Sequence, residues 1–367
     1  MNNIKPITAL GIISSTSYDG ISLATVTSDG VDIRQLGTAY IAPLDEHIME
    51  AIRSIDGRRA TDSPDTANKI RQVEILFTQF CAQLAKSYLA ETDQPIDVIG
   101  FAGHTICHRP LEKYTHQIGD GAMLADLCQI KTVSRFRNAD ILNGGQGAPF
   151  TPIYYQALTA KYPRPLAVID IGGTASISWF GHNGEMIAFV AGPGNSVIND
   201  WVMRHGAMHM DYNGRLAILG KVHEPILANL MKHKYFTQTP PKACDRSMFN
   251  DKIEHLEGLS LEDGAATATA FVAEAIKQSI LSFLPELPQE IYICGGGAKN
   301  PTLMRFIRQR LPDITIKTTA ENGWNSDVID AQAAAFWAIR RLNLLPISYP
   351  FTTGVAVPCI CGEIFEP

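Results

Sequence analysis

Two short turns in the chain combine glycines with hydroxyl and carboxylate side chains, a composition suited to binding phosphate groups. The first turn reads "SSTSYDG" (residues 14–20) and the second reads "DIGGT" (residues 170–174). Glycines let backbone N–H groups approach phosphate oxygens, and the Ser and Thr hydroxyls add further donors. Asp19 and Asp170 stand where a carboxylate can hold Mg²⁺ through its waters. Two such turns facing each other would hold a nucleoside triphosphate, and two ordinary hairpins are the alternative.

A third glycine-rich segment, "CGGGAKNP" (residues 294–301), follows an apolar run and precedes a helix predicted to begin near Thr302. Three consecutive glycines allow the backbone to approach a flat ring or a phosphate, and a simple strand-to-helix turn is the alternative. The sequence contains no Walker-type phosphate loop. Together the three segments indicate a two-lobed phosphotransferase of the actin or hexokinase type.

Other glycine-containing turns are candidates for further ligand contacts. Asp120 lies between two glycines in "IGDGA" (residues 118–122), where it either contacts a ligand or stabilises its own turn. A second glycine-rich turn is "GGQGAP" (residues 144–149). The segment "FVAGPGN" (residues 189–195) also has the composition of a ligand loop, yet it begins with Val190 and an alanine, which offer no side-chain chemistry.

The histidines do not form a recognisable metal-binding pattern. His104 and His108 are four residues apart, as on one face of a helix, but a following proline and a preceding strand pattern argue against a helix. His205 and His209 share this spacing and are interpreted as a solvated or core pair. We therefore do not expect a metal centre built from histidines.

Strand patterns alternate with helical patterns along the chain. Apolar residues recur at helical spacing over residues 66–90 and 264–284, whereas short apolar runs precede polar turns at 96–105 and 290–300. Each of the two phosphate-type turns lies between β-rich runs and is predicted as strand, tight turn, strand; "HNG" (residues 182–184) predicts a further hairpin. This alternation indicates an α/β architecture.

The bulk properties limit the classes of function. With 367 residues, 46% of them hydrophobic, the chain can form two lobes. A net charge of −6 argues against a general nucleic-acid or membrane-surface role, because both need a basic face. The seven cysteines include no CxxC pair, and Cys359 and Cys361 are too close to indicate a zinc site by themselves. Since no secretory leader pattern is present, we expect a cytoplasmic protein.

From end to end, the chain resembles the 1,6-anhydro-N-acetylmuramic acid kinases. The resemblance is carried by "GIISSTSYDGIS", "IGFAGHTICHRP", "IGDGAMLA", "FRNADILNGGQGAPFTP", "AVIDIGGTASIS", "FVAGPGN", "MDYNGRLAILG", "PPKACDRSMFN", "CGGGAKNPTLM" and "SDVIDAQAAAFWAIRRL", which occur in the family's order. It implies a two-lobed actin-like ATPase fold, a duplicated ribonuclease H-like unit with an interlobe cleft, and a homodimer. The expected division is an N-terminal lobe (1–163), a C-terminal lobe with the second phosphate turn and the adenosine loop (164–345), and a tail packing back on the N-terminal lobe (346–367).

The resemblance also implies a coupled reaction. A carboxylate takes a proton from water, the water opens the 1,6-anhydro bridge, and the freed O6 takes the γ-phosphate of ATP. The family's base is the Asp of a DTGPGN loop, and the matching residue here is Val190, followed by Ala191 in place of Thr. Loss of a positioned base costs about 10²–10⁴ in rate. Asp170 and Asp120 are the candidate substitutes.

Other departures from the family pattern gather on the sugar side. Ala102 and His104 replace a His and a Gln, and Arg135 replaces an Asp. The predicted nucleotide-binding residues are Ser14, Thr16, Asp19, Gly20, Gly172, Gly173, Thr174, Gly295, Gly296 and Gly297. The predicted substrate-binding residues are Asp120, Gly145, Gln146, Gly192 and Asn195, and the predicted Mg²⁺ ligands are Asp19 and Asp170.

Three functional hypotheses follow. The first is an ATP-dependent kinase of 1,6-anhydro-N-acetylmuramic acid or a related sugar, in cell-wall recycling. The second is a catalytically impaired relative that binds a nucleotide or a muropeptide-derived sugar as a sensor or partner. The third is a kinase of an ordinary sugar, whose own hydroxyl is the nucleophile, so that no water need be activated.

Overall fold

The computed structural model describes residues 5–367 except 16, 17, 19, 207 and 245. The chain forms two compact units, the first joining Met1–Ala160 to Asp327–Pro367 and the second consisting of Lys161–Ser326. The second unit is thus a continuous insertion into the first. The predicted division kept residues 327–345 with the C-terminal lobe, whereas the structure groups this segment with the first unit, because its helix packs on the first sheet.

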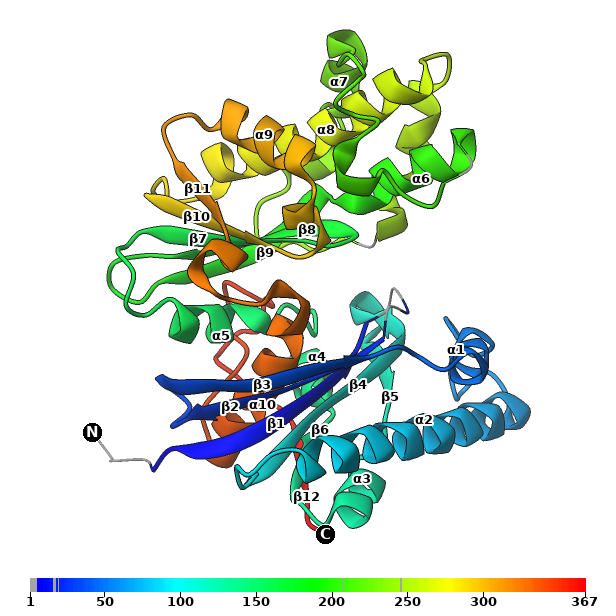
Figure 1. The fold of residues 1–367 in the computed structure, drawn as a ribbon, viewed down its shortest axis with the longest axis vertical. Helices are drawn as coiled ribbons and strands as arrows, with labels where there is room; N and C mark the ends of the chain where they lie inside the picture. Colours follow the sequence, from blue (N-terminus) through cyan, green and yellow to red (C-terminus); the bar gives the residue numbers. More distant parts are fainter. Residues whose placement is uncertain (1–4, 16–17, 19, 207, 245) are drawn as a thin grey trace. The chain divides into compact units, whose positions relative to one another are not determined.

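The first unit is built on a mixed sheet with the strand order β12-β6-β4-β1-β2-β3, and β5 pairs with β4 (Figure 1). The strands are β1 (Ile7–Ser14), β2 (Ile21–Ser28), β3 (Ile33–Ala42), β4 (Val98–Arg109), β5 (Tyr114–Ile118), β6 (Thr132–Ser134) and β12 (Glu363–Phe365). The helices are α1 (Glu46–Arg53), α2 (Pro64–Ala90), α3 (Gly121–Cys128), α4 (Phe136–Leu142), α5 (Thr151–Leu158) and α10 (Ile329–Leu342).

Side-chain alternation along β1 assigns the two faces of this sheet to different helices. Leu10 and Ile12 belong to a core cluster with residues of α2, whereas Gly11 between them faces α10. Gly11 pairs in parallel register with Gly100 of β4, and a Cβ at either position would overlap the backbone of α10. The bare strip made by these two glycines lets the alanine-rich helix α10 approach the sheet closely.

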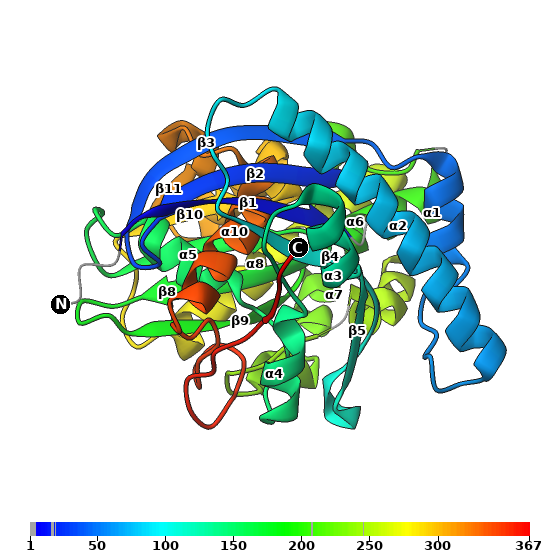
Figure 2. The same ribbon diagram turned by 90° about the horizontal axis from the view of Figure 1, so that it is seen from below.

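The tail of the chain completes the first unit. Strand β12 pairs antiparallel with β6, which extends the sheet by one strand. Figure 2 shows the C-terminus beside α3. A second tail contact is the antiparallel bridge between Ser348 and Cys359.

The second unit contains a sheet with the order β11-β10-β7-β8-β9. Its strands are β7 (Leu166–Ile171), β8 (Thr174–Phe180), β9 (Met186–Pro193), β10 (Glu290–Cys294) and β11 (Thr315–Thr318). Its helices are α6 (Asn195–His205), α7 (Glu224–Leu230), α8 (Leu261–Phe283) and α9 (Pro301–Arg310). Helices α6, α8 and α9 cover one face of the sheet, and the apolar core lies between them and the strands (Figure 1).

These elements confirm the α/β prediction and its local details. Both phosphate-type turns join antiparallel strands, β1 to β2 and β7 to β8, and the "HNG" turn joins β8 to β9. The predicted helices over 66–90 and 264–284 correspond to α2 and α8. Within the described part of the chain, no helix is both long and apolar enough to span a bilayer.

Candidate functional site

The second glycine turn and the FVAGPGN segment are joined by hydrogen bonds into one structure. The carbonyl of Gly173 accepts from the N–H of Gly194 (3.0 Å) and from the Oγ of Ser196 (2.7 Å). Within the turn itself, the N–H of Gly172 donates to the carbonyl of Thr174 (3.0 Å). The two predicted ligand segments therefore hold each other in place.

Asn195 is the residue that ties this structure to its helix. Its N–H donates to the carbonyl of Gly172 (2.8 Å), and its Nδ2 donates to the carbonyl of Ile171 (3.1 Å). Helix α6 begins at Asn195, so an amide that opens this helix is paired with the glycine turn. The Asn195 side chain thus holds the glycine turn in place. This structural role was not part of its prediction as a sugar contact.

The third glycine segment packs against the second. Strands β7 and β10 are parallel neighbours, with Asp170 opposite Cys294, so the loops that follow them meet at the same edge of the sheet. Gly295 has φ +75° and ψ −177°, and a Cβ there would overlap the Asp170 carboxylate and lie 2.7 Å from the carbonyl oxygen of Ile171. A Cβ on Gly297 would lie 2.5 Å from Ile171. The glycines at 295 and 297 are thus required by loop-to-loop packing.

Asp170 is the carboxylate at the centre of these loops. It is the second-last residue of β7, is half-buried, and lies beside Gly295. Gly172, two residues further, has open space on its Cβ side, where the nearest heavy atom is 4.0 Å away. A half-buried carboxylate next to an uncrowded glycine can hold a hard cation, which prefers oxygen ligands.

Val190, which the resemblance predicts to stand at the position of the family base, lies in the middle of β9 and is 9% exposed. Its N–H donates to the carbonyl of Lys242 (2.9 Å), and its own carbonyl accepts from the hydroxyl of Tyr235 (2.7 Å). The backbone is fixed on both sides, while the isopropyl side chain has no atom that can accept a proton.

Behind this strand lies Lys242, which the sequence interpretation missed. It is 6% exposed, its Nζ donates to the carbonyl of Tyr235 (3.1 Å), and it lies 4.3 Å from the ring centroid of Phe283 and 4.7 Å from that of Tyr235. Burial lowers the pKa of Lys242 to about 8. Nothing in its local sequence, "PPKAC", distinguishes a buried lysine from an exposed one.

Gly192, a predicted sugar contact, faces the core of the second unit. It is buried, and a Cβ there would lie 2.9 Å from the ring of Phe236 and 3.3 Å from Ala275. The neighbouring carbonyl of Ala191 accepts from Ser279 Oγ (3.3 Å). These contacts give residues 191 and 192 a packing role.

In the first unit, Ser14 at the end of β1 makes a buried hydrogen bond with His104 on β4. The Ser14 Oγ and His104 Nδ1 are 2.9 Å apart, and burial lowers the pKa of His104 to about 4. The ring of Tyr18 lies 5.4 Å from that of His104, and a Cβ on Gly20 would overlap the carbonyl of Ala42. The predicted ligands Thr16 and Asp19 belong to this turn and lie outside the described residues.

Asp120 caps a helix in the structure. Its Oδ1 accepts from the N–H groups of Ala122 and Met123, both at 3.1 Å, and its Oδ2 is 2.7 Å from the guanidinium of Arg71. Burial opposes ionisation, yet the hydrogen bonds from Met123 and Arg71 leave the pKa of Asp120 lowered. These contacts correspond to the turn-stabilising alternative that the sequence left open.

Gly145 and Gln146 lie in a loop organised by Asp140, a fully buried carboxylate that the sequence interpretation missed. The N–H of Gly145 donates to the carbonyl of Asp140 (2.9 Å), and that of Gly147 donates to its Oδ2 (2.5 Å). The N–H of Gln146 donates to the carbonyl of Thr353 in the tail (2.8 Å). A signal was present, since an Asp a few residues before consecutive glycines can accept from their amides.

The histidine pairs are engaged in separate contacts. His108 Nδ1 is 3.0 Å from Thr115 Oγ1, and His205 stacks on Trp201 with its Nε2 3.0 Å from Glu257. Among the residues for which coordinates are described, no group of three or more His, Cys, Asp or Glu side chains is arranged to hold a metal ion.

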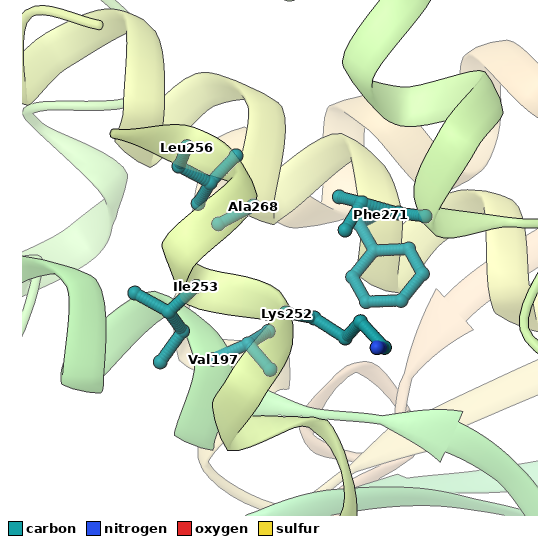
Figure 3. Close-up of a pocket in the computed structure, with 7 residues that line it drawn as sticks. Val197, Lys252, Ile253, Leu256, Ala268 and Phe271 are labelled. Carbon is teal, nitrogen blue, oxygen red and sulfur yellow. The ribbon is translucent and has the colours of Figure 1, made fainter. Parts of the chain in front are cut away.

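A small pocket lies within the second unit, lined by α6, α7, α8 and the 3₁₀ helix η4 (Arg246–Leu256) (Figure 3). Its lining residues are Val197, Leu230, Lys252, Ile253, Leu256, Ala268 and Phe271. Because the lining is almost wholly apolar, the pocket is a gap in core packing and is unsuited to a sugar or a phosphate.

The chain is similar to known proteins over nearly its whole length. A family model described as "Anhydro-N-acetylmuramic acid kinase" matches residues 7–367. The anhydro-N-acetylmuramic acid kinase of Paramagnetospirillum magneticum is 39% identical over 98% of this chain and 99% of its own length, and that of Methylorubrum populi is 40% identical with the same shares. Component A of (R)-2-hydroxyglutaryl-CoA dehydratase from Acidaminococcus fermentans aligns with a TM-score of 0.45 at 13% identity, over 92% of this chain and 99% of that chain, a likeness too low to support an inference.

Proposed function

The chain belongs to the anhydro-N-acetylmuramic acid kinase family, and from this membership we propose that it phosphorylates 1,6-anhydro-N-acetylmuramic acid or a closely related sugar, with ATP as the phosphate donor. The observation that carries the proposal is the meeting of two glycine loops around Asp170 at the edge of the second sheet. The expected setting is the cytoplasm during cell-wall recycling, and the expected assembly is a homodimer without nucleic-acid or membrane partners.

In this proposal the glycine loops receive the nucleotide. Gly172 and Gly173 offer backbone close to the phosphates, and Gly295 to Gly297 line the adenosine side. Asp170 fits a Mg²⁺ ligand because its carboxylate is half-buried beside Gly295 and stands two residues before Gly172, which has open space on its Cβ side. Mg²⁺ bound with ATP neutralises charge that develops on the transferred phosphate. The role of Asp170 predicts that Asp170→Asn weakens binding of Mg·ATP.

The sugar reaction requires a proton acceptor that Val190 cannot supply. Of the two candidate substitutes, Asp120 is engaged by its helix cap and by Arg71, which lower its pKa and make it a weak base. Asp170 is the remaining candidate acceptor, for a substrate seated differently from the family's sugar. Because a carboxylate that holds Mg²⁺ is a poor proton acceptor, this role is an alternative to its role as a Mg²⁺ ligand. If neither acts, loss of the base reduces the rate by about 10²–10⁴.

A second candidate function is favoured by the same observation at Val190. The loop keeps its hydrogen bonds to Lys242 and Tyr235 while its side chain is inert, as expected of a protein that binds nucleotide or a muropeptide-derived sugar without turnover. Such a protein acts as a sensor or partner subunit. It would be stabilised by its ligands and would release no ADP.

The test is phosphorus NMR of the purified protein with Mg·ATP and 1,6-anhydro-N-acetylmuramic acid, with Val190→Asp and Val190→Asn alongside. Asn matches Asp in shape but is a poor proton acceptor, so it is the matched control. Sugar 6-phosphate made by the wild type supports the kinase. Product made only by Val190→Asp supports the binding role and shows that the wild type lacks kinase activity because of this one residue. No product from any of the three contradicts the proposed substrate.

A further inference from the structure

Two cysteines near the C-terminus, Cys359 and Cys361, have no part in the proposed function. Cys359 is half-buried and Cys361 is fully buried, and both are free thiols. Because they are two residues apart, their Cα atoms are separated by at most about 7.6 Å. Disulfides join Cα atoms roughly 4.4–6.8 Å apart, a range that residues at this spacing can reach when the backbone bends between them.

The Cys361 side chain folds back toward Cys359, while the Cys359 thiol donates to the carbonyl of the intervening Ile360 (3.7 Å). The Cys361 thiol donates to the carbonyl of Cys359 with a separation of 3.6 Å, so its sulfur folds back over the preceding residues. Burial, followed by the neighbouring Cys359 side chain, raises the pKa of the Cys361 thiol. On the other side, Nδ2 of Asn143 donates to Cys359 Sγ (3.6 Å), and this sulfur belongs to the more exposed of the two cysteines.

The pair is connected to the glycine loop at 144–149 through a short network in the first unit. The backbone of Cys359 pairs with that of Ser348, and the N–H of Cys359 donates to the carbonyl of Ser348 (3.0 Å). The Oγ of Ser348 donates to the buried carboxylate of Asp140. Asp140 in turn accepts from Gly147, so the thiol pair and the loop share one hydrogen-bond network.

We propose that Cys359 and Cys361 are a dithiol that closes to an intramolecular disulfide by exchange with low-molecular-weight disulfides such as oxidised glutathione. The Cys359 thiolate attacks one sulfur of that reagent, which forms a mixed disulfide and releases one thiol. The Cys361 sulfur then attacks Cys359 Sγ, its proton leaves with the second thiolate, and the sulfur–sulfur bond closes. Two protein thiols are oxidised while one reagent disulfide is reduced to two thiols.

Closure also alters the glycine loop. It removes the Cys361 thiol donor and pulls on the bridge between Cys359 and Ser348, which weakens the hold of Ser348 on Asp140. The amides of Gly145, Gln146 and Gly147 then lose order, because their acceptors are Asp140 and the tail residue Thr353. The redox state of the C-terminal dithiol thereby controls the order of the loop at residues 145–147.

The first experiment equilibrates the reduced protein in glutathione buffers of increasing potential, quenches with acid, and measures intact mass and linked peptides. Wild type is expected to lose about 2 Da, the two thiol hydrogens, with the link mapped to residues 359 and 361. Cys361→Ser should retain glutathione on Cys359, and Cys359→Ser should stay unmodified at Cys361. The matched control is Cys128→Ser, which removes another half-buried thiol of the first unit and should behave as wild type.

The second experiment compares amide hydrogen exchange of the reduced and oxidised forms. Faster exchange at residues 145–147 with unchanged exchange at Gly194 and Asn195 supports the coupling. A stable mixed disulfide on wild type, a link to another cysteine, or no oxidation of the native protein would overturn the dithiol. A disulfide that leaves exchange at 145–147 unchanged would overturn the coupling. Neither measurement uses ATP or sugar, so the outcome is independent of the proposed function.

Discussion

Gly295 is the residue whose substitution tests most directly how the glycine loops of the second unit are held together. Its backbone lies in a region that is nearly exclusive to glycine (φ +75°, ψ −177°), where another residue is strained by about 1–3 kcal/mol. A Cβ there would overlap the Asp170 carboxylate and lie 2.7 Å from the Ile171 carbonyl oxygen. Forced overpacking of this kind costs a further 1–3 kcal/mol or so. We therefore expect Gly295→Ala to lower the free energy of unfolding by about 2–6 kcal/mol.

The matched control is Gly323→Ala in the same unit. Gly323 also has φ +75°, but its ψ of 11° is the milder left-handed helical region, and no heavy atom lies within 4 Å of its Cβ position. This control should lose only roughly 1–2 kcal/mol.

Urea unfolding followed by tryptophan fluorescence measures both variants, since Trp179, Trp201 and Trp324 lie in the second unit. The variant at 295 should also bind Mg·ATP at least about tenfold more weakly, which corresponds to roughly 1.4 kcal/mol, because Asp170 is displaced. If Gly295→Ala destabilises the protein no more than Gly323→Ala does, a glycine is not required at 295. That result would refute the inference that close packing of residue 295 against residue 170 joins the two loops.

Three further substitutions test buried groups by urea unfolding. The pKa of His104 in the folded state is about 4, below its ordinary 6.5. The free energy of unfolding of the wild type should therefore fall by up to about 3 kcal/mol as the pH falls from 6.5 toward 4. His104→Gln should not show this fall, and an equal fall in both proteins would refute the prediction. The pKa of Lys242 in the folded state is about 8, below its ordinary 10.5. The free energy of unfolding should therefore rise by up to about 3 kcal/mol between pH 8 and pH 10.5 in the wild type but not in Lys242→Met. The same pH dependence in both proteins would contradict this. Asp140→Asn should be destabilised by about 3 kcal/mol because the carboxylate accepts from Gly147, Ser348 and Thr353, and a change below 1 kcal/mol or so would contradict it.

Local patterns predicted the long helices α2 and α8 and the strands that flank the glycine turns. The strand, turn, strand units around residues 14–20 and 170–174 follow from turn residues placed between apolar runs, and both helices predicted from periodicity are present. Such features depend on neighbours in the sequence, so the sequence contains the information directly. The packing of α10 against Gly11 and Gly100 joins residues far apart in the chain, and no periodicity encodes that partnership.

The candidate site was predictable by segment but less so by side chain. The loops around Asp170 and Gly295 were each predicted as ligand segments, and they come together because parallel neighbouring strands deliver their carboxyl ends to one edge of the sheet. The substrate-binding roles assigned to Asp120, Gly192 and Asn195 and the nucleotide-binding role assigned to Gly295 stay predictions, although each residue has a structural task in this fold. A glycine or an Asp in a turn can serve ligand binding or local packing, and the sequence pattern is the same in both cases. Which neighbours the residue contacts depends on the folded structure.

The insertion of the second unit into the first has a consequence for synthesis of the protein. Residues 161–326 form a continuous unit that can collapse as soon as it leaves the ribosome, whereas the first unit is completed by residues 327–367. Until α10 emerges, the strip of Gly11 and Gly100 on the nascent sheet has no cover. The usual order, in which the N-terminal part of a chain folds first, is therefore reversed here, and the earliest residues to be translated are among the last to be packed.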